Sequence, residues 1–186
     1  MTSKTTYILL FRGVGGATQL PTAALRTALT AAGFEKVATY INSGNAVVRS
    51  PLAREQVIEQ VIEQVAEIAA RRFAFTKAIH ASTLAEWSAL IARNPFPQAA
   101  ATPKFLHAAL LAAEPQASAI SAIQALAKEG EQFAVIGHVA YLHTPHGFGR
   151  SKMAERFDKL IGVGNTARNW NTVLKLKELA LKDSTP

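Results

Sequence analysis

The chain has 186 residues, of which 49% are hydrophobic and 18% charged, so it is long enough to bury one substantial core or two small ones. It contains no cysteine, which excludes disulfides, thiolate catalysis and the zinc motifs that use cysteine. The apolar run at residues 7–11 is too short to cross a bilayer, and no signal-like segment follows Lys4, so we expect a cytoplasmic protein without a membrane partner.

The formal net charge of +7 is unevenly distributed along the chain. Residues 1–81 carry nine Lys and Arg against five Asp and Glu, residues 82–149 carry three against four, and residues 150–186 carry eight against four. The last fifth of the sequence therefore holds more than half of the net charge. A basic segment of this kind favours a phosphorylated small molecule or a nucleic acid as partner, although net charge can also serve solubility alone.

Residues 1–81 have the pattern of a ferredoxin-like β-α-β-β-α-β unit. Their first element is a continuous apolar run, typical of a strand buried on both faces. The second and third strands enclose a polar, glycine-bearing turn at residues 42–45, which predicts a hairpin. The expected elements are strands at 6–12, 37–41, 46–49 and 73–79, with helices at 21–33 and from Pro51 onward.

Residues 82–186 predict a second α+β unit in a similar order but without the last strand. Asn94-Pro95-Phe96-Pro97 ends its first helix, because proline cannot continue one. The fold class is therefore α+β with two lobes, 1–81 and 82–186, either separate or packed as one compact domain. The expected elements are helices at 83–93, 117–128, 151–162 and 166–182, with strands at 104–111, 133–136 and 139–143.

Several segments of the chain occur together in one known family. They are Tyr7-Ile8-Leu9-Leu10-Phe11-Arg12-Gly13, Gly15-Gly16, Leu20-Pro21, Tyr40 to Asn45, Asn94-Pro95-Phe96 and the block from Arg150 to Leu176, of which Arg168-Asn169-Trp170-Asn171-Thr172-Val173 is the most distinctive. In these segments the chain resembles the bacterial domain-of-unknown-function family 1697, in order and over almost its whole length. The resemblance implies a compact cytosolic α+β protein with two ferredoxin-like lobes. It implies no activity, because none is settled for the family.

The strongest candidate site lies at the predicted starts of the two C-terminal helices. Cations crowd these starts, where unpaired backbone N–H groups and the helix dipole already disfavour positive charge, so a bound anion would explain them. Ser151 is expected to cap the first helix, and Asn165 or Thr166 the second. The residues assigned to this ligand site are Arg150, Ser151, Lys152, Arg168, Asn169, Asn171 and Lys175.

The second of these predicted helices has a polar and an apolar face. Arg168, Thr172 and Lys175 recur at helical spacing on the polar face. Trp170 falls on the apolar face, so we expect it in the core rather than as a stacking surface for a base. Alternatively, these cations are ordinary surface charges that pair with acids such as Glu155 and bind no ligand.

A second candidate region follows the first strand. Gly13, Gly15 and Gly16 could let backbone N–H groups approach a phosphate, with Arg12 adding a bidentate donor. The alternative is a tight turn that needs positive φ. The segment is neither a P-loop nor a dinucleotide-binding fingerprint.

The turn at residues 42–45 is a further polar cluster. Asn42, Ser43 and Asn45 could orient a polar ligand, or they could simply form the hairpin turn. We expect this hairpin tip and the loop after the first strand at opposite edges of the sheet. On that expectation the two motifs do not share one small site.

The sequence gives no reason to assign a metal or a cofactor. His138, His143 and His146 are close in sequence, but the odd spacing of the first two sends them to opposite faces of a strand. A metal site needs three or four convergent ligands. The Gly-x-Ser-x-Gly elbow of many hydrolases is also absent.

Three functions remain open, and whether the protein is an enzyme is among the open points. The first is binding of a phosphate-bearing small molecule or a nucleic acid at the basic site, with the small molecule preferred because the strands lack the aromatic spacing of RNA-reading sheets. The second is an enzyme acting on a small anionic metabolite in the cleft between the lobes, with His143 or His146 as proton carrier. The third is a protein-interaction module, monomeric or homodimeric through an open sheet edge.

Overall fold

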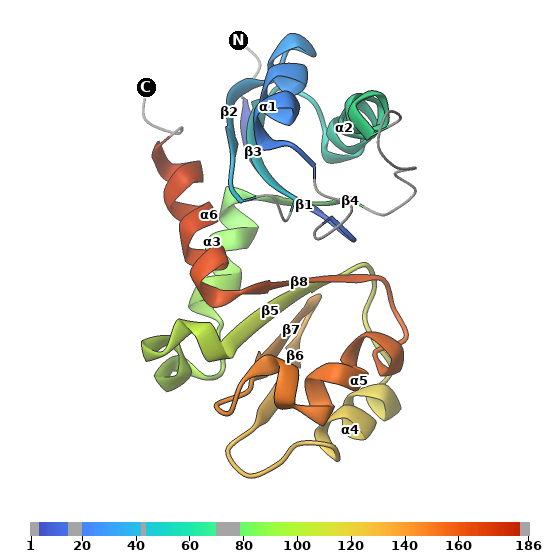
Figure 1. The fold of residues 1–186 in the computed structure, drawn as a ribbon, viewed down its shortest axis with the longest axis vertical. Coiled ribbons are helices and arrows are strands. Elements are labelled where there is room, and N and C mark those ends of the chain that lie inside the picture. Colours follow the sequence, from blue (N-terminus) through green and yellow to red (C-terminus); the bar gives the residue numbers. More distant parts are fainter. Residues whose placement is uncertain (1–3, 15–19, 42–43, 70–78, 183–186) are drawn as a thin grey trace. The chain divides into compact units, whose positions relative to one another are not determined.

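The computed structural model describes residues 4–14, 20–41, 44–69 and 79–182 of the chain. It is an α+β structure with two four-stranded antiparallel sheets (Figure 1). The chain divides into two units, residues 1–88 with 175–186 and residues 89–174. None of the described helices is both long and apolar enough to span a membrane.

The first unit is built on a sheet in the order β2-β3-β1-β4, which is the ferredoxin-like order. Every residue of β1 after Thr5 is buried, which confirms the prediction of a strand enclosed on both faces. Side chains of α1 and α2, such as Leu25 and Val57, pack with β1 and β3 in one core. The elements are β1 (Thr5–Phe11), α1 (Thr22–Ala31), β2 (Glu35–Thr39), β3 (Asn45–Ser50), α2 (Arg54–Ala69) and β4 (Ile79–Thr83). Apart from Ile79, the strand predicted at residues 73–79 lies outside the described residues.

The second unit has a sheet in the order β6-β7-β5-β8, so the same topology occurs twice in the chain. Its core lies between the sheet and the helices α4 and α5, which cover one face (Figure 1). The strands predicted at residues 133–136 and 139–143 are confirmed, and they form a hairpin in which β6 and β7 pair up to Ile136 and Val139. The elements after β4 are α3 (Leu84–Ala92), β5 (Leu106–Leu111), α4 (Ala117–Gln124), β6 (Gln132–Ile136), β7 (Val139–His143), α5 (Lys152–Leu160), β8 (Asn165–Asn169) and α6 (Trp170–Lys182), with short 3₁₀ helices η2 (Pro97–Ala101), η3 (Pro103–Phe105) and η4 (Phe148–Arg150).

The main difference from the sequence prediction is β8, which occupies residues where a helix start was expected. β8 pairs antiparallel with β5, from Asn165 opposite Leu111 to Asn169 opposite His107. The helix α6 begins only at Trp170. The prediction that Asn165 or Thr166 caps this helix is therefore wrong, and the second unit has the complete β-α-β-β-α-β order. Pairing with β5 satisfies the backbone of these residues, which local helix signals could not reveal.

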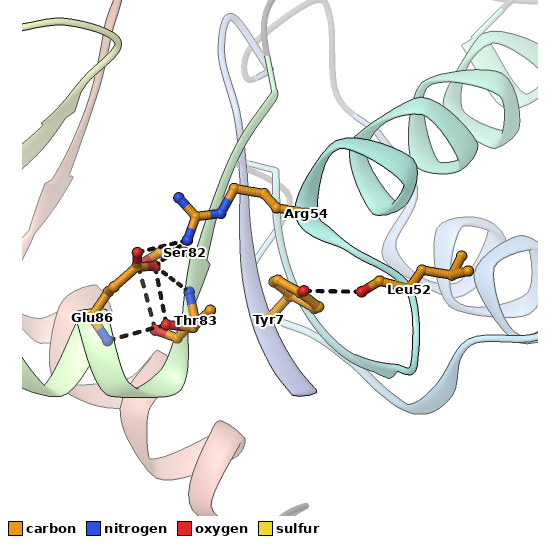
Figure 2. A network of polar contacts seen from close by, with 6 residues as sticks. All are labelled: Tyr7, Leu52, Arg54, Ser82, Thr83 and Glu86. Atoms are coloured by element: carbon orange, nitrogen blue, oxygen red, sulfur yellow. Dashed lines mark hydrogen bonds and ion pairs between the residues drawn. The ribbon is translucent and has the colours of Figure 1, made fainter. Parts of the chain in front are cut away.

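At the end of β4 the chain enters α3 through a capping box, which Figure 2 shows. The Glu86 N–H donates to Thr83 Oγ1 at 3.2 Å, and the Glu86 carboxylate accepts from the Thr83 N–H at 2.8 Å. Arg54, the first residue of α2, donates to both oxygens of the same carboxylate at 2.6 and 2.7 Å. Burial raises the pKa of Glu86, but hydrogen bonds from Arg54 and Thr83 outweigh it and hold that pKa below its ordinary value. One carboxylate thus joins the starts of α2 and α3.

Replacing Glu86 by alanine is expected to lower the free energy of unfolding by about 1–2 kcal/mol, because the cap and the exposed ion pair are lost together. Urea unfolding at neutral pH measures the change. The matched control is Glu59→Ala, which removes an exposed acid in the middle of α2 and is expected to cost less than about 0.5 kcal/mol. Equal effects of the two substitutions would show that the capping box adds nothing.

Candidate functional site

In the first unit, the loop after β1 and the tip of the β2–β3 hairpin lie beside each other. The Phe11 N–H donates to Gly44 O at 2.9 Å, and Leu10 pairs with Asn45 in the β1–β3 register. A Cβ on Gly44 would stand 2.8 Å from Phe11 Cβ and 2.9 Å from Val14 Cβ. The expectation that the two motifs lie at opposite edges of the sheet is therefore wrong. Because β1 and β3 are adjacent antiparallel strands, the end of one meets the start of the other.

The described residues of these two motifs form the turns themselves. Gly13 has φ of 69° and Gly44 has φ of 75°, the left-handed region that favours glycine. Asn45 is 1% exposed, and its Nδ2 donates to Tyr40 O at 3.0 Å, so its side chain closes the hairpin. The phosphate-binding role of Arg12 and Gly13 stays a prediction. Gly15, Gly16, Asn42 and Ser43 lie outside the described residues.

In the second unit, the start of α5 carries a cation on either side of its cap. Ser151 Oγ accepts from the Ala154 N–H at 3.1 Å, which confirms the predicted cap. Arg150 and Lys152 are exposed, and neither forms an ion pair with a described residue. The helix gives the N–H groups of Lys152 and Met153 no internal acceptor. Positive charge and backbone donors therefore occur together at this helix start.

Arg168 and Asn169 lie in β8 rather than in the first turn of a helix, so successive side chains point to opposite faces of the sheet. Arg168 Nη1 donates to Ala167 O at 2.8 Å, and burial lowers the pKa of Arg168 to about 10. Asn169 Oδ1 accepts from the N–H and from Nδ2 of Asn171, both at 3.1 Å, and so caps α6. The sequence argument that Arg168 opposes a helix dipole therefore fails.

The polar face predicted for α6 is also wrong. Arg168 is outside the helix, Thr172 is buried, and Lys175 forms an ion pair with Glu178 at 2.9 Å. The expectation for Trp170 is confirmed, because its side chain is 2% exposed and its ring centroid lies 6.4 Å from that of Tyr141. Lys175 belongs to the first unit and is not assigned to the site in the second.

Sequence reasoning missed His107, a polar residue in the apolar strand β5. Its ring centroid lies 4.2 Å from that of Phe148 in η4, and its Nε2 lies 3.5 Å from Asn169 Nδ2. Burial lowers the pKa of His107 to about 4, so the ring is neutral at physiological pH. The one available signal was a histidine inside the run Phe-Leu-His-Ala-Ala-Leu-Leu, which has no motif around it.

These contacts gather the polar groups of the second unit at one end of its sheet, where β5 begins and β7 and β8 end. The Thr144 N–H donates to Phe105 O at 2.9 Å just beyond β7, and Asn169 Nδ2 donates to Lys104 O at 2.9 Å just beyond β8. The contact of the Phe148 ring with His107 brings η4, and with it the start of α5, to the same end. We call this arrangement the β5 end: Lys104, His107, Phe148, Arg150, Ser151, Lys152, Asn169 and Asn171.

The chain matches the model of a family described as "Protein of unknown function (DUF1697)" over residues 4–141. It belongs to the DUF1697 family. The match ends within β7, so it does not include α5, β8 or α6. No curated protein matches the chain. A solved structure, that of a conserved bacterial protein from Streptococcus pneumoniae, is 23% identical, with 96% of this chain and 99% of that chain covered and a TM-score of 0.64. At this identity the similarity shows the fold alone.

In this DUF1697 protein the β5 end carries positive charge and hydrogen-bond donors. Lys104, Arg150 and Lys152 supply positive charge, and Glu155 is the one acid in the first turn of α5. Lys104 Nζ also lies 4.7 Å from the centre of the Phe105 ring. Among the described residues no group of three or more His, Asp and Glu could hold a metal ion. The chemistry available there is hydrogen bonding and charge stabilisation of an anion.

Proposed function

We propose that this DUF1697 protein binds a phosphate-bearing small molecule at the start of α5, without transforming it. One observation carries the proposal: Arg150 and Lys152, neither of them paired to a described acid, flank the cap of a nine-residue helix. A phosphate placed there would accept from the N–H groups of Lys152 and Met153 and would face both cations. Helix starts of this kind favour phosphate through these donors and through the helix dipole.

Charge elsewhere in the chain favours a small ligand over a long polyanion. On α6, Lys175 and Lys182 form ion pairs with Glu178 at 2.9 and 2.7 Å. On α5, the exposed acids Glu155 and Asp158 alternate with the cations. A nucleic acid would require a continuous basic surface along its backbone. The described helices offer a local cluster of positive charge instead.

Thermal shift and calorimetry against inorganic phosphate, a nucleoside monophosphate and a short single-stranded RNA test the proposal at low and high salt. A ligand at about 100 times its Kd is expected to stabilise the fold by about 2.7 kcal/mol. The double variant Arg150→Ala with Lys152→Ala is expected to bind phosphate at least about tenfold more weakly, since two charge-assisted contacts are lost.

The matched control is Lys159→Ala, which removes an exposed cation from the last turn of the same helix. It changes net charge without touching the helix start, so it is expected to leave phosphate affinity nearly unchanged. Equal losses of phosphate affinity in the control and in the double variant would show that the effect comes from net charge and not from the helix start. Tight binding of the RNA with no response to phosphate would indicate that the ligand is a nucleic acid instead.

A further inference from the structure

The two sheets end in matching edge strands, β2 in the first unit and β6 in the second. An edge strand presents unpaired backbone N–H and C=O groups, on which a further strand can pair. In β2 two features oppose such pairing. Its first residues, Glu35 and Lys36, are charged and exposed, and Lys36 has φ of 52° at a shift in the pairing register between Glu35 and Ala38. Charges and bulges of this kind protect an edge against further pairing.

The strand β6 has neither protection. Its sequence, Gln-Phe-Ala-Val-Ile, contains no charged residue and no proline. All five residues pair with β7 in an unbroken register, from Gln132 opposite His143 to Ile136 opposite Val139. Of the five side chains only that of Phe133 is buried. β6 is therefore a regular, uncharged edge, whereas the equivalent strand of the first unit is charged and interrupted.

The hydrogen bonds of β7 decide which of its residues bond to β6. The Leu111 N–H donates to His138 O, and the Thr144 N–H donates to Phe105 O, both at 2.9 Å. Both bonds join the path of β7 to that of β5, one just before β7 and one just after it. Bonding alternates along an antiparallel strand, so the even-numbered residues from 138 to 144 bond to β5 and the odd-numbered ones to β6.

This alternation fixes the outward backbone groups of β6. The odd-numbered residues of β7 pair with the even-numbered residues of β6, so the groups of Phe133 and Val135 point away from the sheet. In agreement with this direction, Gln124 Nε2 donates to Phe133 O at 3.2 Å from the end of α4. Among the described residues, nothing bonds to the Phe133 N–H or to the N–H and C=O of Val135. A carbonyl oxygen can accept two hydrogen bonds, so Phe133 O also remains available.

We propose that two copies of this chain associate through β6, which pairs antiparallel with β6 of the second copy across a two-fold axis at Ala134. In this register Phe133 lies opposite Val135 of the second copy, and the two exchange N–H···O bonds, so four new hydrogen bonds form in all. Ala134 lies opposite its own counterpart, where small side chains let the strands approach closely. The four-stranded sheets of the two second units then join into one sheet of eight strands.

β6 fits a copy of itself in charge as well as in hydrogen bonding. Like charges directly opposite each other destabilise a strand pair, and β6 contains no charge. The charged residue next to it, Glu131, would lie opposite Gly137 of the second copy rather than opposite another acid. A two-fold contact uses the same surface on both copies, and outward groups placed symmetrically about one residue meet that requirement. The proposal does not depend on ligand binding, because β6 contributes no residue to the β5 end.

Sedimentation equilibrium of the full-length protein without ligand, between about 1 μM and about 1 mM, tests the pairing. The wild type is expected to pass from one chain to two over this range. Ala134→Lys places two like charges against each other at the axis, so it is expected to raise the Kd of the dimer at least about tenfold. The matched control is Gln132→Lys, which adds the same charge on the same face of β6 but opposite Ile136 of the second copy. Its Kd is expected to stay within about threefold of that of the wild type.

A mixture of two variants tests the two-fold axis itself. Ala134→Lys and Ala134→Glu are each expected to stay monomeric alone and to associate when mixed, because opposite charges then meet at the axis. Circular dichroism checks that each variant is folded. A wild type that remains monomeric at about 1 mM overturns the proposal, and so does a dimer that Ala134→Lys leaves intact.

Hydrogen exchange of the Val135 amide in the wild type decides the question if the variants do not fold. Slower exchange at high than at low protein concentration supports the pairing, and equal exchange overturns it. Protection of this amide in a monomer by an added extended peptide would assign the edge to another protein, which also overturns the pairing of two copies.

Discussion

Replacing Gly44 by alanine is expected to lower the free energy of unfolding by about 3 kcal/mol. Two costs add at this position. The backbone has φ of 75°, which an L side chain rarely adopts, and the new Cβ would stand 2.8 Å from Phe11 Cβ and 2.9 Å from Val14 Cβ. The contacted atoms are Cβ atoms tied directly to the backbone, so β1 and its loop would have to move. Urea unfolding at neutral pH measures the change.

The matched control is Gly33→Ala in the same unit. Gly33 has φ of 89°, but a Cβ there would meet nothing within 4 Å. Its substitution is expected to cost about 1 kcal/mol, from backbone strain alone. The difference between the free energies of unfolding of the two variants measures the cost of the close contact between the hairpin tip and the loop after β1. Similar values for both would mean that the two loops are not in contact in solution.

Mild acid is expected to destabilise the protein through His107. Burial lowers the pKa of His107 from 6.5 to about 4 on folding, so between these values the unfolded chain binds more protons than the folded chain. Stability is therefore retained above pH 6.5 and lost progressively as the pH falls toward 4. The free energy of unfolding is expected to fall by about 2 kcal/mol between pH 7 and pH 5, and by about 3 kcal/mol by pH 4.

Urea unfolding at pH 7 and pH 5 tests this expectation, with His107→Phe as the control. The variant has no titrating ring at this position, so its stability is expected to fall by about 2 kcal/mol less over the same range. The window lies above the ordinary pKa of 4.5 of the acids with lowered pKa values, Glu35, Glu86 and Glu178, so their contribution there is small. His143, whose pKa burial also lowers, remains in both proteins. Parallel curves for wild type and variant would show that His107 titrates normally.

The sequence was sufficient where a strand or helix carries its own hydrophobic pattern. The buried run in β1 and the strand Val139–His143 followed directly from their residues, and so did the Ser151 cap of α5. β8 was missed because Asn-Thr-Ala-Arg-Asn has no apolar alternation and becomes a strand only by pairing with β5. Without β8, Arg168 was placed in a helix that begins after it.

The candidate site depends on contacts between segments distant in the sequence, and these were not predictable from local pattern. Asn169 and His107 are opposite each other only because β8 lies beside β5. The meeting of the loop after β1 with the hairpin tip follows from strand order, which the ferredoxin-like topology already contains. That error came from an incorrect reading of the topology rather than from missing information. The surroundings of His107, by contrast, are visible only from side-chain contacts.

The last strand of each sheet runs directly into a helix, and its final residue caps that helix. Thr83 ends β4 and caps α3, while Asn169 ends β8 and caps α6. In both sheets, five residues of the last strand pair with five of the first, ending opposite Tyr7 and His107. Shared strand order, register and junction are what the duplication of one ancestral unit would leave. After such a duplication the two copies can keep one strand order while their side chains diverge, and the tyrosine and the histidine at the same register position are such a divergence.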